Sequence, residues 1–397
     1  MKKFMILAAA AALVLTASCA KNEVLTSPPN DHLIGFSNYT PKNITKANDT
    51  YVSGTTLVNG KAFAVYAWST AYGSFLGVNP GTPNFMAPAV VTWNDDTTDG
   101  DGNTYSPVRY WPAGDEPANL SFTAYYPNGG AGITAPTFAT GVGTYAFTAQ
   151  STPAAMVDFC VADVVNDQTY GHTNKSGSGF NGTVNLPFRH MLTKIQFKFK
   201  KATGLGATTV IELVDAELAN IRNAGTLTAT YAQNASPAVN ALGTTTTTWS
   251  SVAGTAGYEV TLNGADPESG SAIVLTETVN TVAPADIFLM VPQTIVTKTG
   301  ENPQRITVTW KVKVYDTEGH ATTNDGTGLL SETTNSKTLY FYDDLVTSDT
   351  NDTPVGVIQW NKNNFITYTI TIGPKPILFT ATVTDWDAEQ NGYFNVQ

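Results

Sequence analysis

Histidine and cysteine are scarce in this chain, whose 397 residues contain four histidines and two cysteines. The histidines stand in unrelated contexts, and none belongs to the HExxH pattern of zinc proteases; they are His32, His172, His190 and His320. The sequence also lacks a Ser/His/Asp order, a nucleophile elbow and a glycine-rich phosphate loop. These absences argue against an enzyme, and the sequence indicates no cofactor.

Basic charge is also scarce, since the formal net charge is −11 and charged residues make up only 13% of the chain. A nucleic-acid-binding protein needs a basic face, so nucleic acid is excluded as a partner. One acidic turn gathers oxygen-bearing side chains, namely Asp95, Asp96, Asp99, Asp101 and Asn103. A calcium loop of the EF-hand type that began at Asp99 would need Glu at its twelfth position, where this chain has Tyr110. We therefore predict a solvated turn and no metal site.

Long apolar runs are absent beyond the first residues, so no transmembrane helix is predicted. Lys2 and Lys3 precede an apolar segment, residues 4–15, that is too short to span a bilayer comfortably. Small residues then stand directly before Cys19, as in bacterial lipoprotein signals. We predict that residues 1–18 are a signal peptide and that Cys19 carries lipid, including palmitate-type acyl chains. The alternative is an ordinary secretory signal that ends in Ser-Cys. Cys160 then has no disulfide partner, and we expect it to be buried.

What the sequence does contain is alternation of apolar residues with threonine. Residues 366–372 and 377–383 both alternate strictly, and the Gly/Pro segment between them predicts an antiparallel hairpin. Residues 195–199 and 306–315 alternate in the same way, which predicts strands with one buried face. We find no amphipathic helix longer than about two turns. The fold class predicted from this pattern is all-β.

Segments rich in Gly, Thr and Asn separate these strands. Residues 20–31 read as a tether, and residues 33–39 read as a short first strand followed by a polar loop with two lysines. Residues 129–143, 233–256 and 317–338 are predicted to be surface loops. Residues 167–182, rich in turn-forming residues, are the candidate domain boundary. Many short strands with regular turns indicate β-sandwiches, and the length of the chain suggests more than one domain.

Several segments, taken in order, resemble the fimbrillin family, the lipoprotein-type pilins of Bacteroidales bacteria (type V pilus subunits). They are KAFAVYAW (61–68), PVRYWP (107–112), LSFTAYYP (120–127), LPFRHMLTKIQFKFK (186–200), IFLMVPQ (287–293) and WNKNNFITYTITI…TATVTDW (360–386). No single segment is specific, but together they cover nearly the whole chain. The resemblance implies two transthyretin-like β-sandwich domains in tandem, here residues 47–182 and 183–397. It also implies a structural subunit of a pilus that supports adhesion.

The resemblance implies a processing route as well. Fimbrillins reach the outer membrane as lipoproteins, and a trypsin-like protease then cuts after a basic residue in the loop that follows the first strand. The cut removes the lipid and the first strand, which here form residues 19–46. Matched by position, the cleaved bond follows Lys46 and makes Ala47 the new N-terminus. The second choice is the bond between Lys42 and Asn43.

The vacated groove is filled in this family by a strand from the next subunit, commonly its C-terminal segment. In this chain that donor strand would lie within residues 391–397, with Tyr393, Phe394 and Val396 as its apolar residues. The implied partners are other copies of the chain or related pilins, outer-membrane lipid through Cys19, and a ligand on a host or bacterial surface. Shaft, anchor and tip roles all fit the sequence.

A second hypothesis also fits a lipidated β-sandwich, namely a surface-anchored protein that binds glycans on exposed aromatic residues. The candidates for such a surface are Tyr72, Phe75, Trp93 and Tyr105. A glycan-binding protein has no reason to make its first strand removable. The first strand followed by a basic loop therefore favours the pilin hypothesis.

Overall fold

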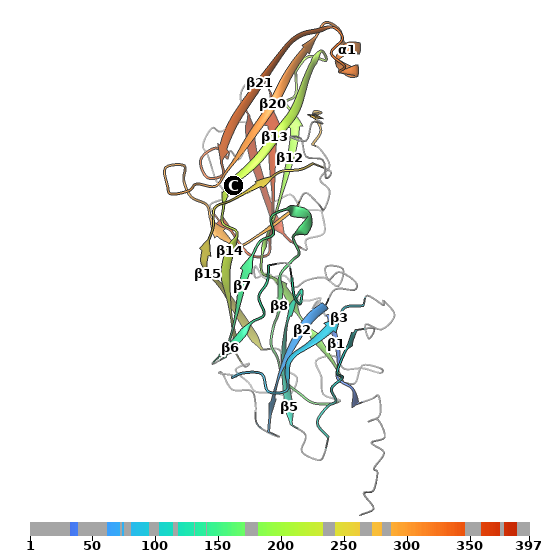
Figure 1. Ribbon diagram of the computed structural model, residues 1–397, viewed down its shortest axis with the longest axis vertical. Helices are drawn as coiled ribbons and strands as arrows, with labels where there is room; N and C mark the ends of the chain where they lie inside the picture. The colour runs from blue at the N-terminus through green and yellow to red at the C-terminus, as the bar shows by residue number, and fades with distance from the viewer. Residues whose placement is uncertain are drawn as a thin grey trace, which may run out of the picture.

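The computed structural model is an elongated molecule built almost entirely of β-strands (Figure 1). It describes residues 32–38, 62–71, 74, 81–94, 103–113, 118–130, 132–139, 141–170, 182–232, 243–262, 272–279, 287–345, 359–373 and 377–386. Within these ranges the helical elements are α1 (Glu318–Thr323) and the short 3-10 helix η2 (Pro153–Ala155). None of the described helices is long and apolar enough to cross a membrane.

Two sheets face each other in the lower half of Figure 1. The larger sheet runs β11 (Phe188–His190), β8 (Cys160–Ala162), β5 (Asn119–Tyr126), β2 (Ala62–Thr70), β3 (Met86–Thr92) and β4 (Thr104–Tyr105), with β9 (Val165–Gln168) beside β5. The smaller runs β15 (Thr244–Ala253), β14 (Ala224–Ala232), β7 (Val142–Thr148) and β6 (Thr137–Ala139). Tyr125 of β5 contacts Tyr145 of β7 with ring centroids 5.6 Å apart. Such contacts between the inner faces make this pair a β-sandwich.

Two further sheets form the upper half of the molecule. One runs β18 (Phe288–Met290), β12 (Thr193–Lys201), β23 (Asn364–Ile372) and β24 (Leu378–Asp385). The other runs β16 (Ala256–Glu259), β13 (Thr209–Ile221), β20 (Arg305–Tyr315) and β21 (Leu329–Tyr340), with β17 (Ile273–Val274) beside β13. Tyr258 of β16 and Phe288 of β18 join the two sheets, with ring centroids 5.9 Å apart. The core between them is again that of a sandwich.

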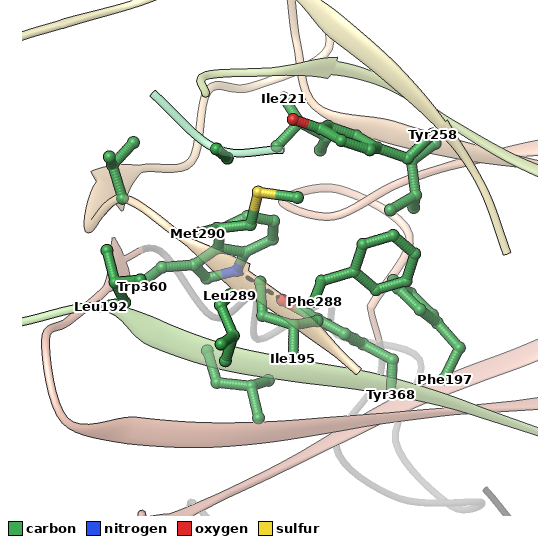
Figure 2. Close-up of a cluster of buried hydrophobic side chains, with 14 of the residues drawn as sticks. Leu192, Ile195, Phe197, Ile221, Tyr258, Phe288, Leu289, Met290, Trp360 and Tyr368 are labelled. Carbon is green, nitrogen blue, oxygen red and sulfur yellow. Dashed lines mark hydrogen bonds between the residues drawn. The ribbon is translucent and has the colours of Figure 1, made fainter. Parts of the chain in front are cut away.

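Alternation in β23 produces this upper core. Ile366, Tyr368, Ile370 and Ile372 are all fully buried, whereas the threonines between them are only half-buried. Figure 2 shows how Tyr368 packs near Phe197 and Phe288 and meets the indole of Trp360. The Trp360 Nε1 donates to the Tyr368 hydroxyl at 2.8 Å. The buried indole N–H of Trp360 therefore has a hydrogen-bond acceptor, so the core can contain both aromatic side chains.

Strand pairing crosses the expected boundary at residue 182. β14 comes from the second half of the chain, yet it pairs with β7, aligning Leu227 with Tyr145. β11 pairs with β8 in the same way, aligning His190 with Cys160. The division of the chain at residues 182 and 183 stays a prediction, and strands from both sides of it share sheets.

The structure confirms the strands that were expected from alternation. The C-terminal hairpin is β23 and β24, paired in antiparallel register with Tyr368 opposite Ala381. The expectation of surface loops was wrong in three places, because β6, β15 and β21 lie within or extend into residues 129–143, 233–256 and 317–338. In β20, Val312 and Val314 are only half-buried, because β13, β20 and β21 continue beyond β12 (Figure 1).

Candidate functional site

The first strand, β1 (Gly35–Asn38), lies between two other segments of the lower half. On one side it pairs in parallel with β10 (Thr183–Leu186), aligning Phe36 with Val184. On the other side the Ile34 amide donates to the Arg109 carbonyl at 3.0 Å, and the Trp111 amide donates to the His32 carbonyl at 3.0 Å. Backbone hydrogen bonds therefore hold residues 32–34 on one side and residues 35–38 on the other.

Two side chains of this segment enter the core. Ile34 is fully buried and Phe36 is 2% exposed. The Phe36 ring lies 5.8 Å from that of Phe122 on β5 and 5.5 Å from that of Tyr105 on β4. Both residues belong to a buried cluster, called here the first-strand cluster. It consists of Ile34, Phe36, Phe63, Val65, Ala67, Met86, Val91, Trp93, Trp111, Leu120, Phe122, Ala124, Tyr126, Cys160, Ala162, Val165, Val184, Leu186 and Phe188.

Polar side chains also hold the backbone of this segment. The Tyr105 hydroxyl donates to the Ile34 carbonyl at 2.9 Å, and the Asn103 Nδ2 donates to the Phe36 carbonyl at 2.9 Å. The Ser37 hydroxyl donates to the Asn185 side-chain oxygen of β10. Burial raises the pKa of Tyr105 to about 12, so its hydroxyl stays a donor at neutral pH.

Close packing around Gly182 fixes the start of β10. This residue has a φ of +87°, and a Cβ there would lie 2.9 Å from the Leu33 carbonyl oxygen and 3.0 Å from the Trp111 Nε1. The Gly182 carbonyl accepts from both the Gly35 amide and the Trp111 Nε1 at 3.0 Å. Only glycine fits here without strain. The chain thus brings residue 182 directly against the first strand.

If β1 left, the edge of β10 and part of the first-strand cluster would be uncovered. Burying two large apolar side chains contributes on the order of 3–6 kcal/mol, at about 1.5–3 kcal/mol each. An open edge with unpaired backbone groups binds another strand readily. The geometry around β1 therefore suits a groove that accepts an extended segment with alternate apolar side chains.

The chain matches the fimbrillin-like family over residues 45–386. This match spans most of the chain. The chain belongs to the fimbrillin-like family. Membership confirms the resemblance seen in the sequence and identifies a fimbrial structural protein rather than an enzyme.

Among solved structures, the fimbrillin-like chain is similar to a fimbrial protein from Bacteroides vulgatus. The identity is 19%, the TM-score is 0.55, and the match covers 89% of this chain and 99% of that one. This likeness shows the shared fold. A fimbrilin from Porphyromonas gingivalis matches with 12% identity over 89% of this chain and 96% of that one, with a TM-score of 0.36. A search of curated protein sequences finds no match.

The site residues predicted from the sequence fall outside the described residues of this fimbrillin-like chain. This applies to Cys19, to the cleavage candidates Lys42, Asn43, Lys46 and Ala47, and to the donor residues Tyr393, Phe394 and Val396. Their roles stay predictions. The described elements that flank them are β1, which precedes the lysines, and β24, which precedes the C-terminal tail.

The end of β24 is anchored at Trp386, the last described residue. Its amide donates to the Asn363 carbonyl at 3.1 Å. Its ring stacks on His190 of β11, with centroids 4.2 Å apart and planes 11° apart. The Lys194 ammonium lies 5.6 Å from the same ring, within cation–π range. The end of β24 is therefore held against β11 of the lower half of the molecule.

The aromatic residues proposed for glycan binding do not form an exposed platform in the described part of the chain. Trp93 is 6% exposed and belongs to the first-strand cluster, so the expectation that it is exposed was wrong. Tyr105 is half-buried, and its hydroxyl bonds to the first strand. Tyr72 and Phe75 lie outside the described residues. Trp93 directly follows β3, and burial alternates through it, with Val91 buried, Thr92 exposed and Trp93 buried.

Proposed function

We propose that this fimbrillin-like chain is a pilus subunit that is exported as a lipoprotein, clipped after Lys46 and polymerised by strand exchange. In this proposal β1 fills its own groove until the cut, and the C-terminal tail of another copy or of a related pilin then replaces it. The position of β1 is the observation that carries the proposal. Two buried side chains and backbone hydrogen bonds on two sides tie residues 32–38 to the fold, yet this segment joins the rest of the chain through the lysine-bearing residues 39–61.

The length of the tail supports the donor role. Residues 387–397 follow the anchored Trp386 and span about 36–40 Å when extended, at about 3.3–3.6 Å per residue. That reach exceeds the length of a typical strand of about 17–20 Å. The tail can therefore supply both a linker and a strand of five or six residues.

Lipid attachment at Cys19 would hold the uncut subunit at the outer membrane. Several acyl chains bind a bilayer far more firmly than one, so the precursor stays attached until it is cut. The cut removes the anchor and the first strand together. One proteolytic event would thus couple release from the membrane to opening of the groove.

The test is a set of lysine variants in the producing cells. Lys42→Gln combined with Lys46→Gln removes both cleavage candidates, and we expect the subunit to stay lipidated and monomeric, with no SDS-resistant ladder. Lys21→Gln is the matched control, because a cut there would leave β1 in place, and its ladder should equal that of the wild type. An undiminished ladder in the double variant would refute cleavage at these lysines.

A tail truncation tests the donor strand separately. A chain that ends before Asn391 keeps every described element. We expect it to be cut normally and to fail to polymerise with itself. A normal ladder from the truncated chain would assign the donor strand to another segment.

A further inference from the structure

A buried cluster of three potential metal ligands lies where β8 and β11 meet. Cys160 and His190 stand opposite each other in the antiparallel register, so their side chains point to the same face of the sheet. Asp158 precedes Cys160 by two residues. In extended backbone, side chains two residues apart lie on the same face, so Asp158 lies on the face of Cys160. The possible ligand atoms of the three residues all lie within 4.8 Å of one another.

The distances show how closely these atoms gather. The His190 Nδ1 lies 2.6 Å from the Asp158 Oδ2, and the Cys160 Sγ lies 2.9 Å from the same oxygen. The sulfur and the ring nitrogen are 3.9 Å apart. Cys160 is fully buried and His190 is 1% exposed, whereas the Asp158 side chain is 10% exposed. The carboxylate is therefore the route by which an ion could enter from solvent.

This arrangement differs from a nucleophilic triad. In such a triad the two ring nitrogens face different partners, with one toward the nucleophile and the other toward the carboxylate. Here the same nitrogen, Nδ1, faces both the sulfur and the carboxylate. The buried Cys160 is also closed to a substrate. Thiolate, imidazole and carboxylate directed at one point instead form a ligand set that suits zinc.

The second carboxylate oxygen provides an independent observation. The Asp158 Oδ1 is buried and has no hydrogen-bond partner among the described residues. A buried oxygen without a partner is costly and uncommon in folded proteins. An ion bound by both oxygens of Asp158 would satisfy it. The donor set would then be Sγ, Nδ1 and a bidentate carboxylate.

We propose that Asp158, Cys160 and His190 bind one divalent transition-metal ion, with zinc as the natural choice. Tetrahedral zinc places a bound sulfur and a bound nitrogen about 3.5 Å apart, near the 3.9 Å between Sγ and Nδ1. The carboxylate must move from the imidazole by roughly 0.5–1 Å, because two zinc ligands cannot stay at hydrogen-bond distance. Binding displaces the thiol proton, because zinc binds cysteine as the thiolate.

The ion would also stiffen the junction at which the tail begins. Trp386 stacks on His190, and a metal bond at Nδ1 would fix the orientation of that ring. This consequence is separate from strand exchange. Failure to bind metal would leave the proposed function untouched.

The test is a metal titration of the full-length protein. After dialysis against a chelator, the wild-type protein should take up one Co²⁺ per chain. The bound Co²⁺ should show a thiolate-to-cobalt band in the near ultraviolet and quench part of the tryptophan fluorescence. Zn²⁺ should displace Co²⁺ and raise the melting temperature.

Variants then assign the ligands. Cys160→Ala should abolish the near-ultraviolet band, and Asp158→Asn should weaken uptake at least tenfold. His320→Gln is the matched control, since His320 of α1 forms a similar, exposed pair at 2.5 Å with Asp316, which precedes the helix, and no thiol joins them. Its uptake should equal that of the wild type.

Trp386→Leu tests whether Trp386 is a tryptophan whose fluorescence the bound Co²⁺ quenches, and it changes no proposed ligand. It should keep the cobalt band and lose part of the quenching, because Trp386 is the ring stacked on His190. Two results would overturn the proposal. One is wild-type protein that binds no Co²⁺ or Zn²⁺, a result that does not depend on whether any variant folds. The other is a folded Cys160→Ala protein that shows the same band as the wild type.

Discussion

Substitution of Phe36 by alanine separates the role of β1 in the precursor from its role in the polymer. In the uncut protein Phe36 is 2% exposed and packs against Phe122 and Tyr105. Phe-to-Ala changes in cores cost about 3–5 kcal/mol. Phe36→Ala should therefore lower the melting temperature of the precursor by roughly 6–20 °C, at about 2–4 °C per kcal/mol for a folding unit of this size.

The same substitution should leave the polymer unchanged. In the proposed mechanism the cut removes residues 19–46, so Phe36 is absent from every assembled subunit. Phe122→Ala is the matched control, because Phe122 lies in the same cluster but on β5. That variant should destabilise precursor and polymer alike.

The assay is thermal unfolding of the uncut, purified chain, compared with the temperature at which the SDS-resistant ladder dissociates. Loading is normalised to the amount of cut subunit, so that poor export of a weakened precursor does not count as weak assembly. If Phe36→Ala lowers the dissociation temperature of the ladder as much as Phe122→Ala does, then β1 remains in the polymer and the reasoning is refuted.

Three further predictions concern the fold itself. Gly182→Ala should destabilise the precursor by about 1–3 kcal/mol, because its φ is +87° and its Cβ would meet a carbonyl oxygen at 2.9 Å; Gly81→Ala, where a Cβ meets nothing within 4 Å, should have little effect in the same melt. Trp360→Phe should cost more in urea unfolding than Trp310→Phe, because only the Trp360 Nε1 has a hydrogen-bond partner. Burial raises the pKa of Tyr231 to about 12, so the stability it contributes is complete below pH 10 and is lost as pH rises through 12. The free energy of unfolding should therefore fall less steeply with pH in Tyr231→Phe than in the wild type between pH 10 and pH 12. The difference in slope should be about 1.4 kcal/mol per pH unit.

Strands with one buried face were predictable from the sequence, because burial imposes a period of two. In β23 the side chains of Ile366 and Ile370 are fully buried, and the intervening threonines are not. The same rule predicted β12 from Phe197 and Phe199. The hairpin of β23 and β24 followed from the Gly/Pro segment between two such runs.

Strands without a buried face were missed for the same reason. β21 is exposed along most of its length, and it is an edge strand held by backbone pairing to β20. β15 begins with a run of threonines, which carries no alternation, and its position is set by pairing with β14. Such strands depend on distant partners that a local pattern does not contain.

The candidate site was predictable in part. A short apolar first strand was predictable from residues 33–39, and the structure places Ile34 and Phe36 of that segment in the core. The parallel pairing of β1 with β10 was not predictable, because the two strands lie about 150 residues apart and neither turn chemistry nor periodicity links them. The contact of Asp158 with Cys160 and His190 was missed likewise, since it depends on the register of β8 with β11.

The most direct test of the central claim is the intact mass and N-terminal sequence of the protein sheared from producing cells. The account predicts a chain that starts at Ala47, or at Asn43 for the second cleavage candidate, carries no lipid and forms an SDS-resistant ladder. Protein that resists shearing and still begins at acylated Cys19 would contradict strand exchange after cleavage.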